Sequence, residues 1–338
     1  MSANVTAPSP NLFFDTLNAF QRTEAIKAAV DLRVFSAIGK ESASAAEIAQ
    51  RCDSSERGIR VLCDYLTMMG FLTKEDNRYA LTQDSALFLD RQSPAYLGGV
   101  MDFLLSDDVI GAFKNMASCV RKGGTLLGGE GSVVPENPMW VTFARSMAPL
   151  MGPAAEFMAD LVGGNANQTL RVLDVAAGHG MFGIAIGKRF PRAEIVALDW
   201  SNVLQVAEEN ATRAQLDGRY NLQPGSAFDL DWGTGFDIVL LTNFLHHFDH
   251  SQCEALLRRA HAALKPDGRL FTLEFVPDED RVSPPRAAAF SLTMLATTLA
   301  GDAYTFSELE TMLRNAGFSH NELKPLPVGI EQLVISRK

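Results

Sequence analysis

Residues 170–187, LRVLDVAAGHGMFGIAIG, decide the fold of this chain. They begin with the apolar residues Val172, Leu173 and Val175, a run typical of a strand buried on both faces. A loop of small residues, 176–180, comes next, and apolar residues then recur at helical spacing. Glycines in such a loop let the backbone turn sharply and let a ligand approach closely. The stretch therefore predicts the first strand–loop–helix unit of a nucleotide-binding α/β domain.

The glycine pattern alone leaves two ligands open. Gly178-x-Gly180-x-x-Gly183 fits the dinucleotide fingerprint, and Asp199 follows at about the distance of a ribose-binding acid, so NAD is one candidate. Asp174, however, directly precedes the loop, where a carboxylate could hold the ammonium group of a ligand. One carboxylate before the glycines and another at the end of the second strand suit an amino acid joined to a nucleoside. This pair favours S-adenosyl-L-methionine over NAD.

Segments typical of strands and helices alternate from residue 170 onward, as expected of a Rossmann-like parallel sheet. Strands are expected at 194–198, 220–223, 237–242 and 269–275, and helices at 203–215, 252–265, 287–299 and from Thr305 to Gly317. The last two expected strands, 323–326 and 331–336, have no helix between them and predict an antiparallel hairpin that closes the sheet. A dinucleotide fold needs a second nucleotide-binding half instead, which again disfavours NAD.

Residues 11–92 predict a winged helix. Apolar residues recur at helical spacing over 11–35, Ser44 and Glu47 form a capping box, and a further helix starts at Asp53 with Glu56 and runs to Gly70. A hairpin is expected from 71–73 and 78–81 around a turn at 74–77.

The charge of the chain argues against a nucleic-acid partner. Its 338 residues carry a net charge of −10, and residues 1–90 hold nine Lys and Arg against twelve Asp and Glu. A DNA-binding regulator is therefore disfavoured, because binding phosphates needs a basic surface. The first helix carries more apolar surface than a small module can bury, so we expect a homodimer formed through this domain.

The region 93–165 is expected to be a helical connector, followed by a cofactor domain at 166–338. The apolar residues of the connector either belong to a core or form the roof of a pocket over the α/β domain. A pocket for a flat apolar ring would use the following residues: Phe103, Phe143, Met147, Met151, Phe290, Met294 and Leu295.

The four cysteines are widely spaced and are expected to be free buried thiols. The N-terminus shows no basic-then-apolar signal and no apolar run approaches a membrane span, so we expect a cytoplasmic protein without a membrane partner.

The chain as a whole resembles the S-adenosylmethionine-dependent O-methyltransferases of the plant phenol and acetylserotonin type, and looks closest to their bacterial members. The resemblance rests on VLDVAAGHG (172–180), IVALDW (195–200), LTNFLHHFDHSQCEALL (241–257), LKPDGRLFTLEF (264–275) and DAYTFSELETMLRNAGF (302–318). It implies an N-terminal dimerisation domain, S-adenosyl-L-methionine as cofactor, and methylation of a hydroxyl on an aromatic small molecule.

The resemblance also implies a set of cofactor-binding residues. Asp199 would accept hydrogen bonds from the ribose hydroxyls, although it could instead be a helix N-cap, and Trp200 would pack on the adenine. Ser226 stands where the family has an Asp that contacts the adenine amine. The full expected set is Asp174, Ala176, Gly178, Gly180, Asp199, Trp200, Ser226, Ala227, Phe228, Asn243, Phe143 and Met147.

His246 is the expected catalytic base. It follows the 237–242 strand, so it emerges at the carboxyl end of the sheet, and the family motif places a Cys seven residues after its His, which selects His246 through Cys253. A phenol has a pKa of ~10, so a positioned base should remove its proton at neutral pH. Glu274 resembles the family glutamate that orients this imidazole, whereas Ala303 stands where the family has a second one.

Three alternatives stay open. His246 could be purely structural, or it could bind a metal with His250, although no companion ligand has suitable spacing and no metal is expected. Because one supporting glutamate is replaced, C- or N-methylation or a non-methylating reaction such as decarboxylation or rearrangement is a further alternative.

Overall fold

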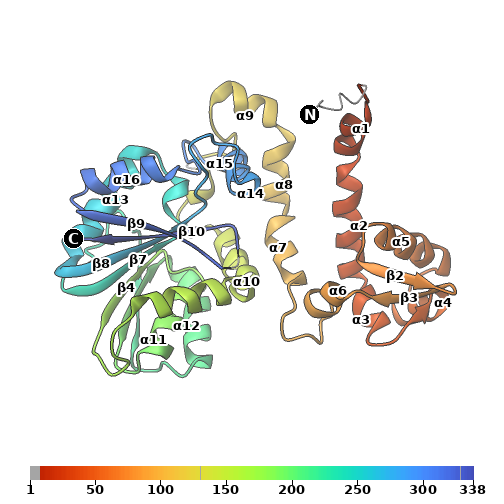
Figure 1. Ribbon diagram of the computed structural model, residues 1–338, viewed down its shortest axis with the longest axis horizontal. Helices are drawn as coiled ribbons and strands as arrows, with labels where there is room; N and C mark the ends of the chain where they lie inside the picture. Colours follow the sequence, from red (N-terminus) through yellow and green to blue (C-terminus); the bar gives the residue numbers. More distant parts are fainter. Residues whose placement is uncertain (1–7, 130, 328) are drawn as a thin grey trace, which may run out of the picture. The chain divides into compact units, whose positions relative to one another are not determined.

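The computed structural model describes residues 8–129, 131–327 and 329–338 and contains two compact units, the first ending at Met101 and the second beginning at Asp102 (Figure 1). The expected boundary after residue 92 falls within the first unit. Each unit has a buried apolar core of its own. No helix among the described residues has the length and apolar character needed to cross a bilayer.

The first unit is a winged helix. Its elements are α1 (Asn11–Leu17), α2 (Ala19–Asp31), α3 (Val34–Ile38), β1 (Ala43–Ser44), α4 (Ala45–Arg51), α5 (Glu56–Met68), β2 (Leu72–Glu75), β3 (Arg78–Leu81), α6 (Gln83–Phe88) and the 3-10 turn η1 (Gly98–Val100). The three strands form an antiparallel sheet in the order β1-β3-β2. The predicted capping box is confirmed, since Ser44 and Glu47 cap each other's backbone at the start of α4.

Two local predictions in this unit were wrong. The cap of α5 is Ser55, whose Oγ accepts from the Gly58 amide, because Asp53 adopts a left-handed conformation before the helix begins. The hairpin turn is tighter than expected, with only Asp76 and Asn77 between the strands. Both have positive φ, of 45° and 61°, as two-residue hairpin turns require.

Helices α7 (Met101–Leu104), α8 (Asp107–Lys114), α9 (Met116–Lys122), the turn η2 (Gly131–Val133) and the long helix α10 (Pro138–Val162) precede the sheet. Helix α10 packs against α11 (Met181–Arg189) and α12 (Ser201–Arg213). The predicted connector is therefore helical, and its last helix lies against the helices of the α/β domain.

The sheet has seven strands in the order β6-β5-β4-β7-β8-β10-β9. Their bounds are β4 (Arg171–Val175), β5 (Glu194–Asp199), β6 (Tyr220–Pro224), β7 (Phe236–Thr242), β8 (Leu264–Glu274), β9 (His320–Pro325) and β10 (Gln332–Arg337). β4 to β8 pair in parallel, whereas β10 is antiparallel to both β8 and β9, which confirms the predicted C-terminal hairpin.

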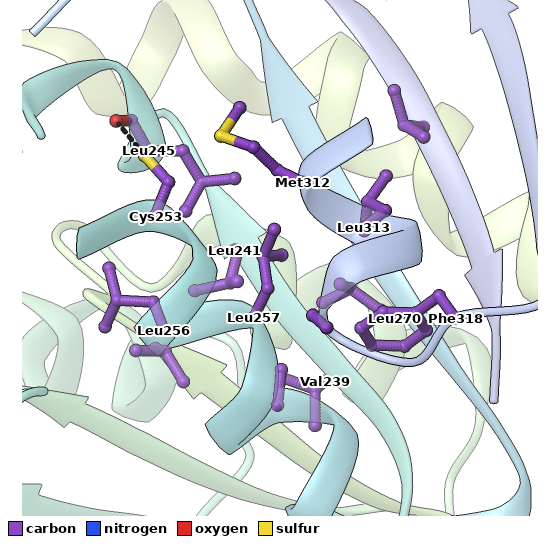
Figure 2. Packing of buried hydrophobic residues seen from close by; sticks show 14 of the residues in the cluster. Val239, Leu241, Leu245, Cys253, Leu256, Leu257, Leu270, Met312, Leu313 and Phe318 are labelled. Atoms are coloured by element: carbon purple, nitrogen blue, oxygen red, sulfur yellow. Dashed lines mark hydrogen bonds between the residues drawn. The ribbon is translucent and has the colours of Figure 1, made fainter. Parts of the chain in front are cut away.

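Helices cover both faces of this sheet (Figure 1). Helices α11 and α12 lie on one side, while α13 (His250–Ala263) and α16 (Phe306–Asn315) lie on the other, and η3 (Leu245–His247), α14 (Pro285–Ala288) and α15 (Phe290–Thr297) complete the unit. Figure 2 shows the core on the second side, where Val239 and Leu241 of β7 lie with Leu257 of α13 and Met312 and Leu313 of α16. This packing fixes the ends of β7 and β8, which carry the site described below.

Two predicted boundaries in this unit were wrong. Helix α13 ends at Ala263, and β8 already begins at Leu264 and runs through Gly268, because the pairing with β7 shifts register between Phe236 and Ile238 and admits these residues to the sheet. The helix expected at 287–299 is two shorter helices, α14 and α15, joined at Ala289.

Candidate active site

A cavity of about 470 Å³ lies at the carboxyl ends of β4, β5, β6 and β7, with part of α10 beside it. Its volume lies within the range of small-molecule sites, and its position is where parallel sheets bind ligands. It is lined by residues 176–179 after β4, Asp199 and Trp200 after β5, 225–229 after β6, 242–244 with His247 after β7, and Trp140 and Phe143 of α10, among others.

Asp199 is fixed against the glycine-rich loop. Its Oδ2 accepts from the Gly178 amide at 2.8 Å, and its Oδ1 accepts from the Trp200 amide at 2.7 Å. The N-cap of α12 is Trp200, so Asp199 is not the helix cap that was its alternative role. Burial raises the pKa of the Asp199 carboxyl to about 6. Each carboxylate oxygen keeps a lone pair with which it can accept a hydrogen bond from a ligand hydroxyl.

Three residues of the expected cofactor set lie outside this cavity. Asp174 is fully buried beneath the loop, where its Oδ2 accepts from the Gly183 amide of α11 at 3.1 Å and its Oδ1 has no hydrogen-bond partner among the described residues. Gly180 is the N-cap of α11 with a φ of 74°, and a Cβ there would lie 2.5 Å from the Tyr220 hydroxyl, so packing explains this glycine. Met147 packs into the core formed with α11.

The other nine expected residues line the cavity: Ala176, Gly178, Asp199, Trp200, Ser226, Ala227, Phe228, Asn243 and Phe143. Ser226 is engaged locally, because its Oγ accepts from the Phe228 amide at 3.1 Å. A hydroxyl can accept one bond and donate another, so Ser226 offers a ligand a weaker contact than a carboxylate would.

His246 and Glu274 form a buried pair. Neither residue is among those that line the cavity, although Phe244 and His247 on the same loop as His246 are. The Nδ1 of His246 lies 2.6 Å from Oε2 of Glu274, and the two residues are 4% and 3% exposed. The second oxygen, Oε1, accepts from the Phe244 and Leu245 amides at 3.0 and 2.7 Å. Three contacts therefore hold the carboxylate in place. An imidazole that donates to it from Nδ1 keeps the lone pair of the ring on Nε2.

The loop that carries His246 is fixed by hydrogen bonds to backbone carbonyls on both sides of this residue. The Cys253 thiol donates to the Leu245 carbonyl at 3.2 Å, as Figure 2 shows, and the Tyr304 hydroxyl donates to the Phe248 carbonyl. Gly301 lies so close that a Cβ there would be 2.1 Å from the His246 carbonyl oxygen. The spacing from His246 to Cys253 thus has a structural reason, because the thiol fixes η3.

Aromatic side chains surround the His246 ring. Phe290 meets it edge-on at 4.9 Å, and Phe275 lies 5.8 Å away and stacks on Phe290 with centroids 3.7 Å apart. Ala303 is buried and supplies no second carboxylate. Within the described residues, Glu274 is the one acidic side chain that contacts His246.

Two histidines that were not predicted as site residues, His179 and His247, also line the cavity. His179 lies inside the glycine-rich loop, so its place between Gly178 and Gly180 was the signal that could have found it. His247 contacts Trp140 edge-on at 5.1 Å, and burial holds its pKa well below the usual range, so its ring is neutral at pH 7.

The metal alternative receives no support from the geometry. The Nδ1 of His246 is engaged by Glu274, and His250 is exposed with its ring beside Tyr304. Across residues 8–129, 131–327 and 329–338, no three His, Cys, Asp or Glu side chains converge as metal ligands.

Both units of the chain match known protein families. Residues 14–91 match the model of an O-methyltransferase dimerisation domain, and residues 160–319 match that of an O-methyltransferase domain. A solved structure from Nostoc punctiforme PCC 73102, assigned to the O-methyltransferases, is 50% identical with a TM-score of 0.94, over 98% of this chain and all of that one.

Two further relatives are more distant. A 3-hydroxy-5-methyl-1-naphthoate 3-O-methyltransferase of Streptomyces sahachiroi is 27% identical over 92% of this chain and 90% of its own length. Human N-acetylserotonin methyltransferase, solved in complex with S-adenosylmethionine, is 21% identical with a TM-score of 0.83, over all of this chain and 99% of that one.

Proposed function

This chain belongs to the S-adenosylmethionine-dependent O-methyltransferases, and from that membership we propose that it methylates a hydroxyl of an aromatic small molecule with His246 as the general base. The observation that carries the proposal is the buried pair of His246 and Glu274, with His246 on the loop whose residues Phe244 and His247 line the cavity. An imidazole held by a carboxylate on Nδ1 presents a lone pair at Nε2, which is what a base for a weakly acidic hydroxyl needs.

The residues that line the cavity fit the cofactor. Asp199 offers a fixed acceptor for ribose hydroxyls, and the aromatic rings of Trp200 and Phe228 offer faces for a base. We assign cofactor binding to these residues together with the backbone of Ala176 and Gly178, Ser226, Ala227, Asn243 and Phe143. When bound, S-adenosyl-L-methionine supplies a methyl group whose bond to the sulfonium sulfur breaks with both electrons remaining on sulfur, leaving neutral S-adenosylhomocysteine.

The protein contributes proton removal and orientation. Nε2 of His246 takes the hydroxyl proton as the acceptor oxygen forms its bond to the methyl carbon, so the imidazole becomes a cation. Glu274 then faces this cation at 2.6 Å and stabilises it, while two backbone amides keep the carboxylate in place. Glu274 is thus a positioning residue that acts through His246.

Phe275 and Phe290 support an aromatic acceptor. They lie against the His246 ring and present flat apolar surfaces next to the proposed base. The relative from Streptomyces sahachiroi, whose name gives a hydroxylated naphthoate as its substrate, agrees with an acceptor of this class.

We also propose that the chain works as a homodimer through its N-terminal unit. Helices α1 and α2 expose Leu12, Phe13, Phe14, Leu17 and Phe20, each more than half accessible. So large an apolar surface on two successive helices is typical of a protein interface, and the match to a dimerisation domain makes a second copy the expected partner.

The proposed reaction is tested with a panel of phenols and methyl-labelled cofactor. We expect the label on the oxygen of an aromatic product, with one S-adenosylhomocysteine formed per methylated molecule. Label on carbon or nitrogen would indicate C- or N-methylation, and an acceptor consumed without S-adenosylhomocysteine would indicate a non-methylating reaction. Either result would contradict the proposal.

A further inference from the structure

His179 has a defined tautomer. The Met181 amide donates to His179 Nδ1 at 3.1 Å, and a backbone N–H can only donate, so Nδ1 carries no proton. Burial lowers the pKa of the ring to about 4, so it is neutral at pH 7. The single ring proton is therefore on Nε2, which makes no hydrogen bond within the described structure.

The surroundings of His179 hold this donor in one place. The ring is 4% exposed, lies nearly parallel to Phe143 at 6.3 Å, and contacts Phe182 at 5.8 Å. The Asn210 side chain donates to the His179 carbonyl at 2.9 Å, which fixes the backbone. His179 also lines the cavity, so a donor without a hydrogen-bond partner among the described residues belongs to the wall of the ligand site.

A donor at this position selects an acceptor. Nε2–H cannot bind the ammonium or sulfonium group of the cofactor, because both are positively charged and neither acts as an acceptor. Among the cofactor's acceptors, which include ribose oxygens and adenine nitrogens, the carboxylate carries the negative charge and forms the strongest hydrogen bond with an N–H donor. His179 also lies directly before the N-terminus of α11, a helix of nine residues, where backbone amides and the helix dipole favour an anion. Asp199, as an acceptor on the same loop, suits the hydroxyl groups instead.

We infer that His179 binds the carboxylate of the methionine moiety of S-adenosyl-L-methionine through Nε2–H, as a neutral donor whose tautomer is fixed by the Met181 amide. A neutral ring suits this site because a protonated imidazole would repel the ammonium and sulfonium charges of the same ligand. The inference concerns the cofactor alone and does not depend on which acceptor is methylated or on the role of His246.

Two substitutions separate the donor at Nε2 from the acceptor that Nδ1 offers to the Met181 amide. In His179→Asn, the short side-chain oxygen can still accept from the Met181 amide, but no N–H reaches the position of Nε2. In His179→Gln, the longer side chain can place an N–H near the position of Nε2, but it has no acceptor at the position of Nδ1 for the Met181 amide. The two variants therefore remove one function of the ring each.

The test is titration calorimetry of the full-length protein with S-adenosyl-L-methionine and with its decarboxylated analogue, which keeps the sulfonium and ammonium groups. We expect His179→Asn to weaken S-adenosyl-L-methionine binding roughly tenfold or more and to leave the analogue's affinity unchanged, with Gln restoring part of the loss. An equal loss for both ligands, or no loss for either, would overturn the inference. Thermal unfolding of the unliganded variants verifies that each one is folded.

Discussion

His246 lies in η3 just after β7, Glu274 is the last residue of the neighbouring parallel strand β8, and His246 Nδ1 is 2.6 Å from Glu274 Oε2. The strand pairing sets this distance, because Thr242 lies opposite Leu273 and the chain then turns at Asn243, whose amide donates to the Leu273 carbonyl at 2.7 Å. Backbone geometry therefore places the proposed base next to its carboxylate, and such fixed placement is the preorganisation that catalysis requires.

Replacing Glu274 by Gln tests the positioning role. The Gln oxygen can keep the bonds from the Phe244 and Leu245 amides, but its amide nitrogen would donate to His246 Nδ1 and drive the ring proton to Nε2. With the lone pair removed from Nε2, we expect kcat to fall on the order of 10²–10⁴-fold while calorimetry shows unchanged cofactor binding. A variant within a few-fold of wild type across the pH profile would contradict the role of Glu274.

Cofactor binding should weaken at low pH through Asp199. Ribose hydroxyls donate most strongly to an ionised carboxylate, and burial raises the pKa of this group to about 6. As the pH falls through 6, the carboxyl takes up a proton, loses its negative charge and presents a donor at one oxygen. Affinity should therefore fall, by up to about tenfold, between pH 7 and pH 5.

The matched control is Asp199→Asn, which does not titrate. Its binding of S-adenosyl-L-methionine, followed by calorimetry, should be weak and nearly flat over the same pH interval. Wild-type affinity that is constant, or that increases toward pH 5, is incompatible with this role of Asp199.

Gly301 should tolerate no larger residue. A Cβ would lie 2.1 Å from the His246 carbonyl oxygen, a backbone atom that can move only if η3 moves. We expect Gly301→Ala to destabilise the fold by about 1–3 kcal/mol and to lower kcat more than cofactor affinity. The control is Gly111→Ala in α8, where a Cβ meets nothing within 4 Å and the added helix propensity gives at most ~1 kcal/mol of stabilisation. Denaturant unfolding and kcat, measured on both variants, decide the point.

The exposed face of α1 and α2 should hold the dimer together. The double substitution Phe13→Glu and Phe14→Glu would replace two exposed aromatic rings of the proposed interface with negative charges. We expect sedimentation velocity to show a dimer for the wild-type chain and a monomer for the double variant. The control is a single change on the same unit, Met68→Glu at an exposed site of α5, which should leave the dimer intact. A wild-type chain that sediments as a monomer would rule out the proposed homodimer.

The sheet and its order of elements could be predicted from the sequence because strand and helix patterns are local. The antiparallel C-terminal hairpin followed from the absence of a helix between two short apolar segments, and the structure confirms it. The start of β8 at Leu264 was not foreseen, since a register shift against β7 depends on the partner strand and leaves no signal in the residues of β8 alone.

The part of the site that could be predicted from the sequence is the set of residues that directly follow the parallel strands. Residues that directly follow β4, β5, β6 and β7 mostly line the cavity, as parallel sheet geometry requires. Asp174 belongs to the strand itself, where the alternation of side chains decides which way it points, and it faces α11. The tautomer of His179 needed three-dimensional contacts, because it depends on which backbone amide reaches the ring.

The most direct test of the account is the dependence of the His246→Ala defect on the acidity of the acceptor. The measurement is single-turnover methyl transfer, at saturating cofactor and constant pH, to a series of phenols substituted to span several pKa units. A base is needed only when the hydroxyl is protonated, so we expect a loss on the order of 10²–10⁴-fold for phenols with a pKa of ~10. That loss should disappear for phenols already ionised at the assay pH. An equal loss across the whole series, or full activity on the weakly acidic phenols, would contradict the assignment of His246 as the general base.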